Sequence, residues 1–128
     1  QMCIRDSPII NDQNKRTLKF GEYDQNQQFE KNKYGINEPI NPSLVSIDLL
    51  DAVLFPLVGF DRNGNRIGMG GGFYDKTFEF VATKKKNKLK LIGLGFSIQE
   101  TSNIPNRAWD LPLQYIVTEK EFICAEQK

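Results

Sequence analysis

The sequence predicts an α/β protein that has a mostly parallel sheet flanked by helices. Residues 52–58, AVLFPLV, and residues 89–96, LKLIGLGF, are short apolar runs of the kind that forms strands buried on both faces. A glycine-rich segment and an amphipathic run lie between them. The order of strand, loop, helix and strand is typical of a βαβ unit, and such a unit implies parallel strands.

The residues before this unit predict the end of a buried strand at 8–10, one further short strand and long polar connections. Residues 17–23 alternate apolar and polar side chains, as a half-buried strand does. Residues 24–33 are rich in Asn and Gln and predict a surface connection, and residues 34–39 predict a loop. Pro42 and Ser43 then predict the start of a helical turn.

Residues 73–82 predict the helix of the βαβ unit, because their less polar side chains recur at spacings of three and four. These side chains are Phe73, Tyr74, Thr77, Phe78, Val81 and Ala82. The lysines at 84–86 suit the carbonyl end of such a helix. Residues 114–118 predict a third strand, and Pro56 is expected to end the first one or to mark a bulge in it.

The composition excludes several classes of function. The chain has 128 residues, a formal net charge of +1 and no histidine. The absence of histidine excludes Ser-His-Asp and Cys-His catalysis and histidine-ligated zinc sites. A charge near zero argues against nucleic acid or an acidic membrane as partner. Two cysteines at opposite ends do not form a secreted disulfide framework, so we expect a cytoplasmic protein.

The first seven residues differ in sequence pattern from the rest of the chain. Residues 1–7, QMCIRDS, carry no periodicity and no signal-peptide pattern, and we interpret them as a non-native leader. The alternative is an ordinary disordered terminus. Residues 8–128 are expected to form a single domain, because a chain of this length supports one modest core.

Four glycines, Gly68, Gly70, Gly71 and Gly72, stand immediately before the predicted helix. Glycines let the backbone approach an anion, and helix N-termini favour negative charge. Arg66, taken as an exposed loop residue, would add a positive charge. No Gly-Lys-Ser/Thr follows, so the segment is not a Walker loop. The alternative is a tight turn that lets helix and sheet pack closely. Arg62 could help to bind the anion, although its position in the turn at 61–64 favours a solvated loop residue.

Two carboxylates point to a metal. Asp75 lies one turn inside the predicted helix, where it would repel a bound phosphate unless a cation such as Mg²⁺ lay between them. Asp110, in the loop before the last strand, is a second candidate ligand, and its alternative role is to cap a turn. Trp109 and Tyr74 are minor candidates for contacts with a ligand ring.

Several ordered motifs resemble those of the 5-formyltetrahydrofolate cyclo-ligase family. Residues 51–75, DAVLFPLVGFDRNGNRIGMGGGFYD, are similar to the family signature FD..G.R.G.G.G.YD with its preceding strand. LIGLGFSIQ at 91–99 and IPNRAWDLPLQYIVTE at 104–119 resemble the segments that follow it. LKF at 18–20 and YGINEP at 34–39 also fit, so the resemblance covers nearly everything after Ser7.

The resemblance implies an enzyme that converts 5-formyltetrahydrofolate to 5,10-methenyltetrahydrofolate and uses ATP and Mg²⁺. It also implies a fold like that of sugar-phosphate isomerases and CoA transferases (NagB/RpiA-like). The expected ligands are the folate and ATP, without nucleic acid or membrane, and the expected state is a monomer. Phosphoryl transfer depends on positioning and charge neutralisation, which suits a site without histidine.

The resemblance also assigns roles to individual residues. It places the catalytic role on Arg66 and the metal ligands at Asp75 and Asp110. Its ATP-binding residues fall on Arg66, Ile67, Gly68, Met69, Gly70, Gly71, Gly72, Phe73 and Tyr74. Its folate-binding residues fall on Met69, Gly70, Gly71, Gly72 and Phe73.

The sequence departs from the family pattern in three places. Some members have a larger residue at the position of Gly71 and a tyrosine at that of Phe73. The N-terminal portion of the family, with basic residues for ATP and a carboxylate for folate, is not found in this sequence. The alternatives are therefore a noncatalytic nucleotide- or folate-binding module, an inactive fragment of the enzyme, and a sugar-phosphate or CoA-ester enzyme of related fold.

Overall fold

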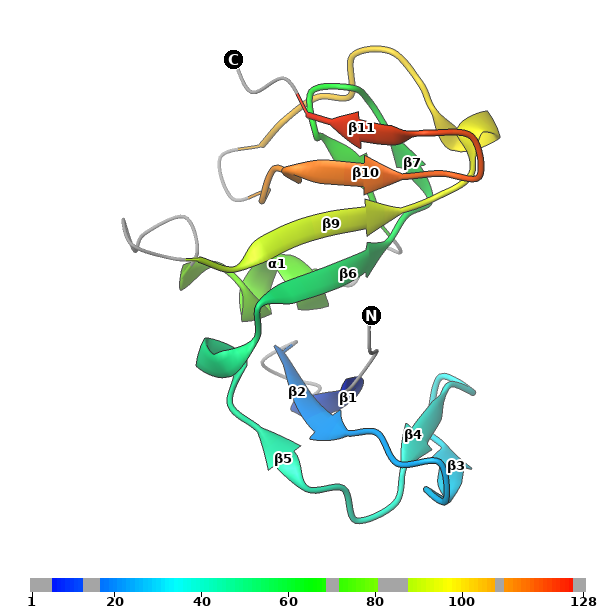
Figure 1. Cartoon of the computed structure of the whole chain (residues 1–128), viewed down its shortest axis with the longest axis vertical. Coiled ribbons are helices and arrows are strands. Elements are labelled where there is room, and N and C mark those ends of the chain that lie inside the picture. Colours follow the sequence, from blue (N-terminus) through cyan, green and yellow to red (C-terminus); the bar gives the residue numbers. More distant parts are fainter. Residues whose placement is uncertain (1–5, 13–16, 69–71, 81–87, 108–109, 126–128) are drawn as a thin grey trace. The chain divides into compact units, whose positions relative to one another are not determined.

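The structure is a computed structural model, which describes residues 6–12, 17–68, 72–80, 88–107 and 110–125. The chain divides into two compact units, Gln1–Leu50 and Asp51–Lys128, each with its own sheet (Figure 1). Among the described residues, no helix has the length and apolar character needed to cross a membrane.

The first unit is built from antiparallel strands. β1 (Asp6–Asp12), β2 (Thr17–Glu22) and β5 (Leu44–Val45) form a three-stranded sheet in the order β1-β2-β5. β3 (Phe29–Lys31) and β4 (Asn37–Pro39) form a separate hairpin. β2 confirms the strand predicted at 17–23. β1 includes Asp6 and Ser7, while the interpretation of residues 1–7 as a leader stays a prediction.

Three connections predicted in the first unit are wrong in part. Residues 24–33 and 34–39 contain β3 and β4, because the turn between them is stabilised locally: the Asn32 carboxamide oxygen accepts hydrogen bonds from the Tyr34 and Ile36 N–H groups. No helical turn begins at Pro42 and Ser43. Instead the Ser43 carbonyl accepts from the Glu22 N–H at 2.8 Å, and β5 follows.

The second unit contains the predicted parallel sheet. β6 (Ala52–Pro56), β9 (Lys90–Leu94) and β10 (Tyr115–Val117) run parallel, and β11 (Phe122–Cys124) adds an antiparallel strand at one edge (Figure 1). The order is β11-β10-β9-β6. The parallel strands are confirmed. β11 was not predicted, because its three residues, FIC, are all apolar and carry no alternation in the sequence.

The predicted burial of the central strands on both faces is wrong. In β6, Val53 and Phe55 are buried, whereas Ala52 and Pro56 are exposed. β9 shows the same alternation. Successive strand residues point to opposite faces, and in the described residues only one face packs into the core. Pro56 ends β6, as predicted.

A hairpin follows β6 where the sequence analysis expected a plain loop. β7 (Gly59–Phe60) and β8 (Arg66–Ile67) pair antiparallel. The Asn63-Gly64 pair between them is a strong hairpin signal that the sequence analysis did not use. Gly64 has φ +89°, and a Cβ there would overlap the Leu113 carbonyl oxygen, so the turn requires glycine.

α1 (Phe73–Thr77) confirms the predicted helix over its first half. Phe78 follows it and packs on the Phe55 ring of β6, with centroids 5.8 Å apart. Val81 and Ala82, expected on the same helix face, lie outside the described residues. The core of this unit is apolar, and its most buried large side chains are Phe55, Phe60, Phe78, Leu91, Leu113 and Ile116.

We expect Gly64→Ala to lower the free energy of unfolding by on the order of 3 kcal/mol, because it adds a backbone clash to an unfavourable φ. Gly35→Ala is the matched control: Gly35 also has a positive φ, of 75°, but a Cβ there meets no atom within 4 Å. Its cost should be limited to about 1–2 kcal/mol. Urea unfolding followed by circular dichroism measures both, and equal losses would contradict the proposed clash.

Candidate functional site

A partly buried ion pair joins the hairpin to the helix. Arg66, at the start of β8, places Nη2 2.6 Å from Oδ1 of Asp75 in α1. The Arg66 side chain is 9% exposed and that of Asp75 is 21% exposed. Arg66 is therefore not the exposed loop arginine that the sequence analysis assumed. Its charge is compensated inside the protein, where a lone guanidinium would be costly.

The ring of Phe55 packs against the guanidinium of this pair. The guanidinium carbon of Arg66 lies 4.8 Å from the centroid of the Phe55 ring, and the Tyr74 ring lies 4.8 Å from it as well. A cation over a ring face is attracted by the ring quadrupole. β6, β8 and α1 thus converge on one point, and the arginine is held on two sides.

Burial of the hydroxyl raises the pKa of Tyr74 above its ordinary value of 10.0, and the positive charge of Arg66 opposes that rise. Tyr74 is accordingly neutral at physiological pH. In this form its hydroxyl remains a hydrogen-bond donor and brings no negative charge near the ion pair.

The Arg66 guanidinium is not fully satisfied. Its Nε is buried and has no hydrogen-bond partner among the described residues. Gly68 lies close to the same group, since a Cβ at this position would lie 3.1 Å from Nη1 of Arg66. A larger residue there would press on the guanidinium, so Gly68 leaves room for it.

Asp75 also contacts the loop that carries the second candidate carboxylate. The Leu111 N–H donates to Asp75 Oδ1 at 3.1 Å, which brings the residue next to Asp110 against Asp75. Asp110 Oδ2 accepts from the Arg107 N–H at 3.0 Å, and the Asp110 N–H donates to the Arg107 carbonyl at 3.0 Å. Asp110 therefore caps a turn, the alternative role considered from the sequence. The described residues contain no cluster of three or more His, Cys, Asp or Glu suited to a metal.

The other predicted site residues are distributed around this pair. Ile67 is 46% exposed on β8, and Gly72 precedes α1 in a left-handed conformation with φ 70°. Phe73 is partly buried. Four candidates lie outside the described residues: Met69, Gly70, Gly71 and Trp109.

Arg62 and Asp61, in the turn before β8, differ from each other in exposure. Arg62 is 54% exposed and forms ion pairs with Glu121 and, at 3.1 Å, with Glu100, as expected for a solvated loop residue. Asp61 is only 2% exposed and accepts hydrogen bonds from the turn and from Ile104. No role was predicted for Asp61 from the sequence.

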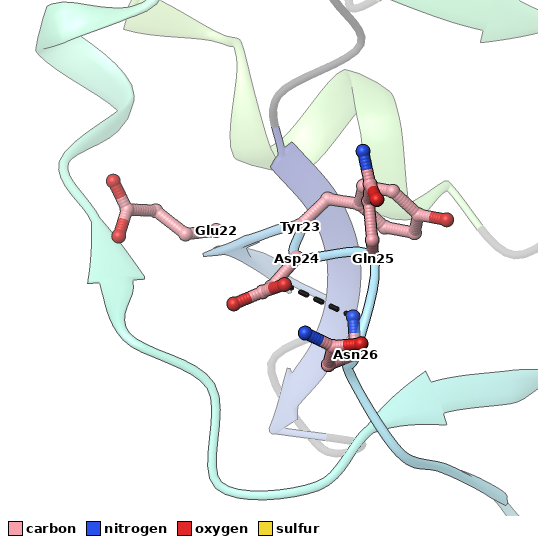
Figure 2. Close-up of a pocket in the computed structure, with 5 residues that line it drawn as sticks. All are labelled: Glu22, Tyr23, Asp24, Gln25 and Asn26. Carbon is pink, nitrogen blue, oxygen red and sulfur yellow. Dashed lines mark hydrogen bonds between the residues drawn. The ribbon is translucent and has the colours of Figure 1, made fainter.

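The first unit contains a hollow that is lined by none of the predicted site residues. It has a volume of about 430 Å³ and is lined by Glu22, Tyr23, Asp24, Gln25 and Asn26. Figure 2 shows these side chains around an open turn in which Asp24 Oδ1 accepts from the Asn26 N–H at 3.0 Å. It is polar and open and contains none of the predicted site residues, so the partly buried pair of the second unit is the stronger candidate site.

The fold is found among proteins of folate metabolism. The solved structure of 5,10-methenyltetrahydrofolate synthetase from Aquifex aeolicus superimposes with a TM-score of 0.74 at 26% sequence identity. The match covers 96% of this chain and 59% of that one.

Sequence comparison agrees with the structural match. The sequence model of the 5-formyltetrahydrofolate cyclo-ligase family matches residues 7–119, and the chain belongs to that family. The 5-formyltetrahydrofolate cyclo-ligase of Haemophilus influenzae is 38% identical over 109 residues, which are 83% of this chain and 56% of that protein. The one from Escherichia coli K12 is 32% identical over 113 residues, 87% of this chain and 60% of that protein. The chain thus spans somewhat over half the length of these relatives.

We expect Asp75→Asn to lower the free energy of unfolding by on the order of 3 kcal/mol, because it leaves the Arg66 charge buried without its carboxylate. Glu79→Gln is the matched control. It breaks the exposed Lys76–Glu79 pair, whose side chains are 55% and 63% exposed. That loss should be below about 1 kcal/mol. Urea unfolding measures both, and a similar small loss in both variants would show that the Arg66–Asp75 pair contributes little.

Tyr74 provides a test of this packing at alkaline pH. Because its folded-state pKa is raised, the unfolded chain loses the Tyr74 proton first as pH rises past 10, and the folded state then loses stability. Subtracting the phenolate absorbance of Tyr74→Phe from that of the parent gives the titration of Tyr74 alone. The pKa obtained in this way should be higher for the folded proteins than for the same two proteins unfolded in urea. Coincident titrations would mean that the hydroxyl is solvated.

Proposed function

We propose that this chain carries the ATP- and Mg²⁺-dependent conversion of 5-formyltetrahydrofolate to 5,10-methenyltetrahydrofolate, with release of ADP and phosphate. The observation that carries the proposal is the family match over residues 7–119, a range that includes the Arg66–Asp75 pair. The names of the relatives from Haemophilus influenzae and Escherichia coli support it.

The proposed chemistry has two steps. The formyl oxygen attacks the γ-phosphorus of ATP, an O–P bond forms, and the bond to the ADP oxygen breaks. The folate nitrogen that does not carry the formyl group then attacks the activated carbon and loses its proton to solvent. The bond between this carbon and the phosphate oxygen breaks, so phosphate leaves as the ring closes. Negative charge accumulates on the transferring group, so preorganised positive charge is the main requirement of the site.

Arg66 is the proposed catalytic residue. Its guanidinium is held by Asp75 on one side and by the Phe55 ring on the other, so it needs little reorganisation when a phosphate arrives. The Nε atom supports the proposal. It has no partner among the described residues, a buried unsatisfied donor costs about 1–3 kcal/mol, and a catalytic role is one explanation for such a group.

The segment around Arg66 is the proposed contact surface for ATP and the folate. We assign ATP contacts to the segment 66–74 and folate contacts to 69–73, as the family resemblance implies. Gly68 supports this assignment by leaving space beside the guanidinium. Tyr74 supports it by being neutral, because an ionised phenol would repel phosphate.

Asp75 and Asp110 are the proposed Mg²⁺ ligands. Both offer carboxylate oxygens, which suit this cation. Asp75 accepts its two hydrogen bonds on Oδ1, and Asp110 accepts its hydrogen bond on Oδ2, so each keeps an oxygen that no described residue occupies. The donor set fits the ion in chemical type. Bound Mg²⁺ would neutralise phosphate charge, while Arg66 and the backbone orient the nucleotide.

The remaining assignments complete the proposal. We propose that the whole protein has the NagB/RpiA-like fold, for which the parallel order of β6, β9 and β10 is partial support. We further propose a cytoplasmic monomer whose ligands are the folate and ATP, without nucleic acid or membrane. The net charge of +1 and the two cysteines support this view.

The test combines product formation with binding. The absorbance rise of 5,10-methenyltetrahydrofolate is followed when the chain is mixed with 5-formyltetrahydrofolate, ATP and Mg²⁺, with an otherwise identical mixture lacking ATP as control. An ATP-dependent rise supports the enzyme. ATP binding by calorimetry without any product would instead favour the noncatalytic nucleotide-binding module.

Arg66→Lys tests the catalytic assignment. It keeps the charge but loses the planar fork that binds phosphate, so ATP affinity should fall about tenfold or more. Arg62→Lys is the matched control, because Arg62 is exposed and pairs with Glu100 and Glu121 outside the site. Its ATP affinity should equal that of the parent. Equal affinities in all three proteins would remove Arg66 from the site.

A further inference from the structure

Asp61 is a buried carboxylate that the proposed chemistry does not use. It is 2% exposed and receives four hydrogen bonds from three residues. A buried carboxylate is costly unless its oxygens are satisfied, and here both are. The number of donors shows that the local structure is arranged around this side chain.

The two oxygens of Asp61 serve different segments. Oδ1 accepts from the N–H groups of Asn63 and Asn65, each at 3.0 Å, and these bonds close the β7–β8 turn. Oδ2 accepts from Asn65 Nδ2 and from the Ile104 N–H, each at 3.0 Å. The bond to Ile104 joins the turn to a segment 43 residues further along the chain. The turn itself does not require that bond.

The loop that begins at Ile104 carries Asp110 and is fastened by carboxylates at two points. Asp61 binds the N–H of Ile104, and Asp75 binds the N–H of Leu111 at 3.1 Å. Asp110 directly precedes the second of these points. Asp110 lies in sequence between the two points, so we expect its position to depend on where the first point holds the loop.

Backbone hydrogen bonds strengthen the same junction. The Thr101 N–H donates to the Phe60 carbonyl at 2.8 Å, and the Leu113 N–H donates to the Gly64 carbonyl at 2.9 Å. The segment is thus attached to both sides of the hairpin turn. The Asp61–Ile104 bond is made by a side chain, so it can be removed without changing the backbone.

We infer that Asp61 is a positioning residue for the proposed magnesium ligands: through Ile104 its carboxylate holds the loop that carries Asp110 and whose Leu111 N–H binds Asp75. This inference rests on the proposed function, because it concerns the same metal site. Removing a residue that orients a metal ligand through a hydrogen bond typically lowers metal affinity by about 10- to 100-fold. We expect an effect at the lower end of this range, because Asp61 acts through a loop.

A charge-conserving exchange separates the two roles of Asp61. In the double variant Asp61→Asn/Asn65→Asp, the new carboxamide oxygen still accepts from the N–H groups of the turn. Its NH₂ group donates to the new carboxylate at position 65, so the turn is kept. The Ile104 N–H then faces a donor and loses its acceptor.

Asn65→Ala is the matched control. It removes the Asn65 Nδ2 donor to the same oxygen of Asp61 but leaves the Ile104 bond in place. A general loss of stability would affect both variants. A positioning effect should appear only in the double variant.

Two measurements on the full chain decide the matter. Amide hydrogen exchange at Ile104 should become at least about tenfold faster in the double variant and stay at the parent rate in Asn65→Ala. The Mg²⁺ concentration that gives half of the magnesium-dependent gain in ATP affinity should rise about tenfold in the double variant alone. ATP affinity in EDTA should be the same in all three proteins.

The outcomes are distinct. Parent-like exchange at Ile104 in the double variant, or faster exchange with an unchanged Mg²⁺ requirement, would overturn the positioning role while leaving the proposed function intact. A parent chain whose ATP affinity does not respond to Mg²⁺ would instead overturn the metal site, and the inference with it.

Discussion

A largely buried guanidinium is costly unless acceptors lie beside it, and several segments of the second unit converge on the ion pair that meets this requirement. Arg66 meets it with Asp75, and the two residues come from β8 and α1, so the hairpin and the helix cannot be placed independently. Phe55 of β6 adds the third contact. The sheet, the hairpin and the helix therefore meet around a single ion pair.

Asp75 extends this arrangement to a fourth segment. Its Oδ1 accepts from both Arg66 and the N–H of Leu111, so one carboxylate links the arginine to the loop that carries Asp110. Asp61 holds the same loop at Ile104. The proposed phosphoryl transfer would need fixed charges, and carboxylates that bind backbone N–H groups provide rigidity as well as charge.

Much of the architecture was accessible from local patterns. The apolar runs around Val53 and Leu91 predicted parallel strands, and β6 and β9 are parallel. Phe73 and Thr77 lie on the predicted helix. The strands that were missed are two or three residues long, as in β3, β4 and β11, and runs of this length carry little periodicity. They are held by turns, such as the one organised by Asn32, more than by their own propensity.

By itself the sequence determined the family, the chemical types of the candidate ligands and the order of the main elements, because these depend on residue identity and short-range spacing. Only the tertiary structure decided that Arg66 is buried against Phe55, that Asp75 is its partner and that Asp61 reaches Ile104. Burial and partnership arise between segments far apart in the chain. Spacing within one segment carries no information about which distant donor will reach a given carboxylate.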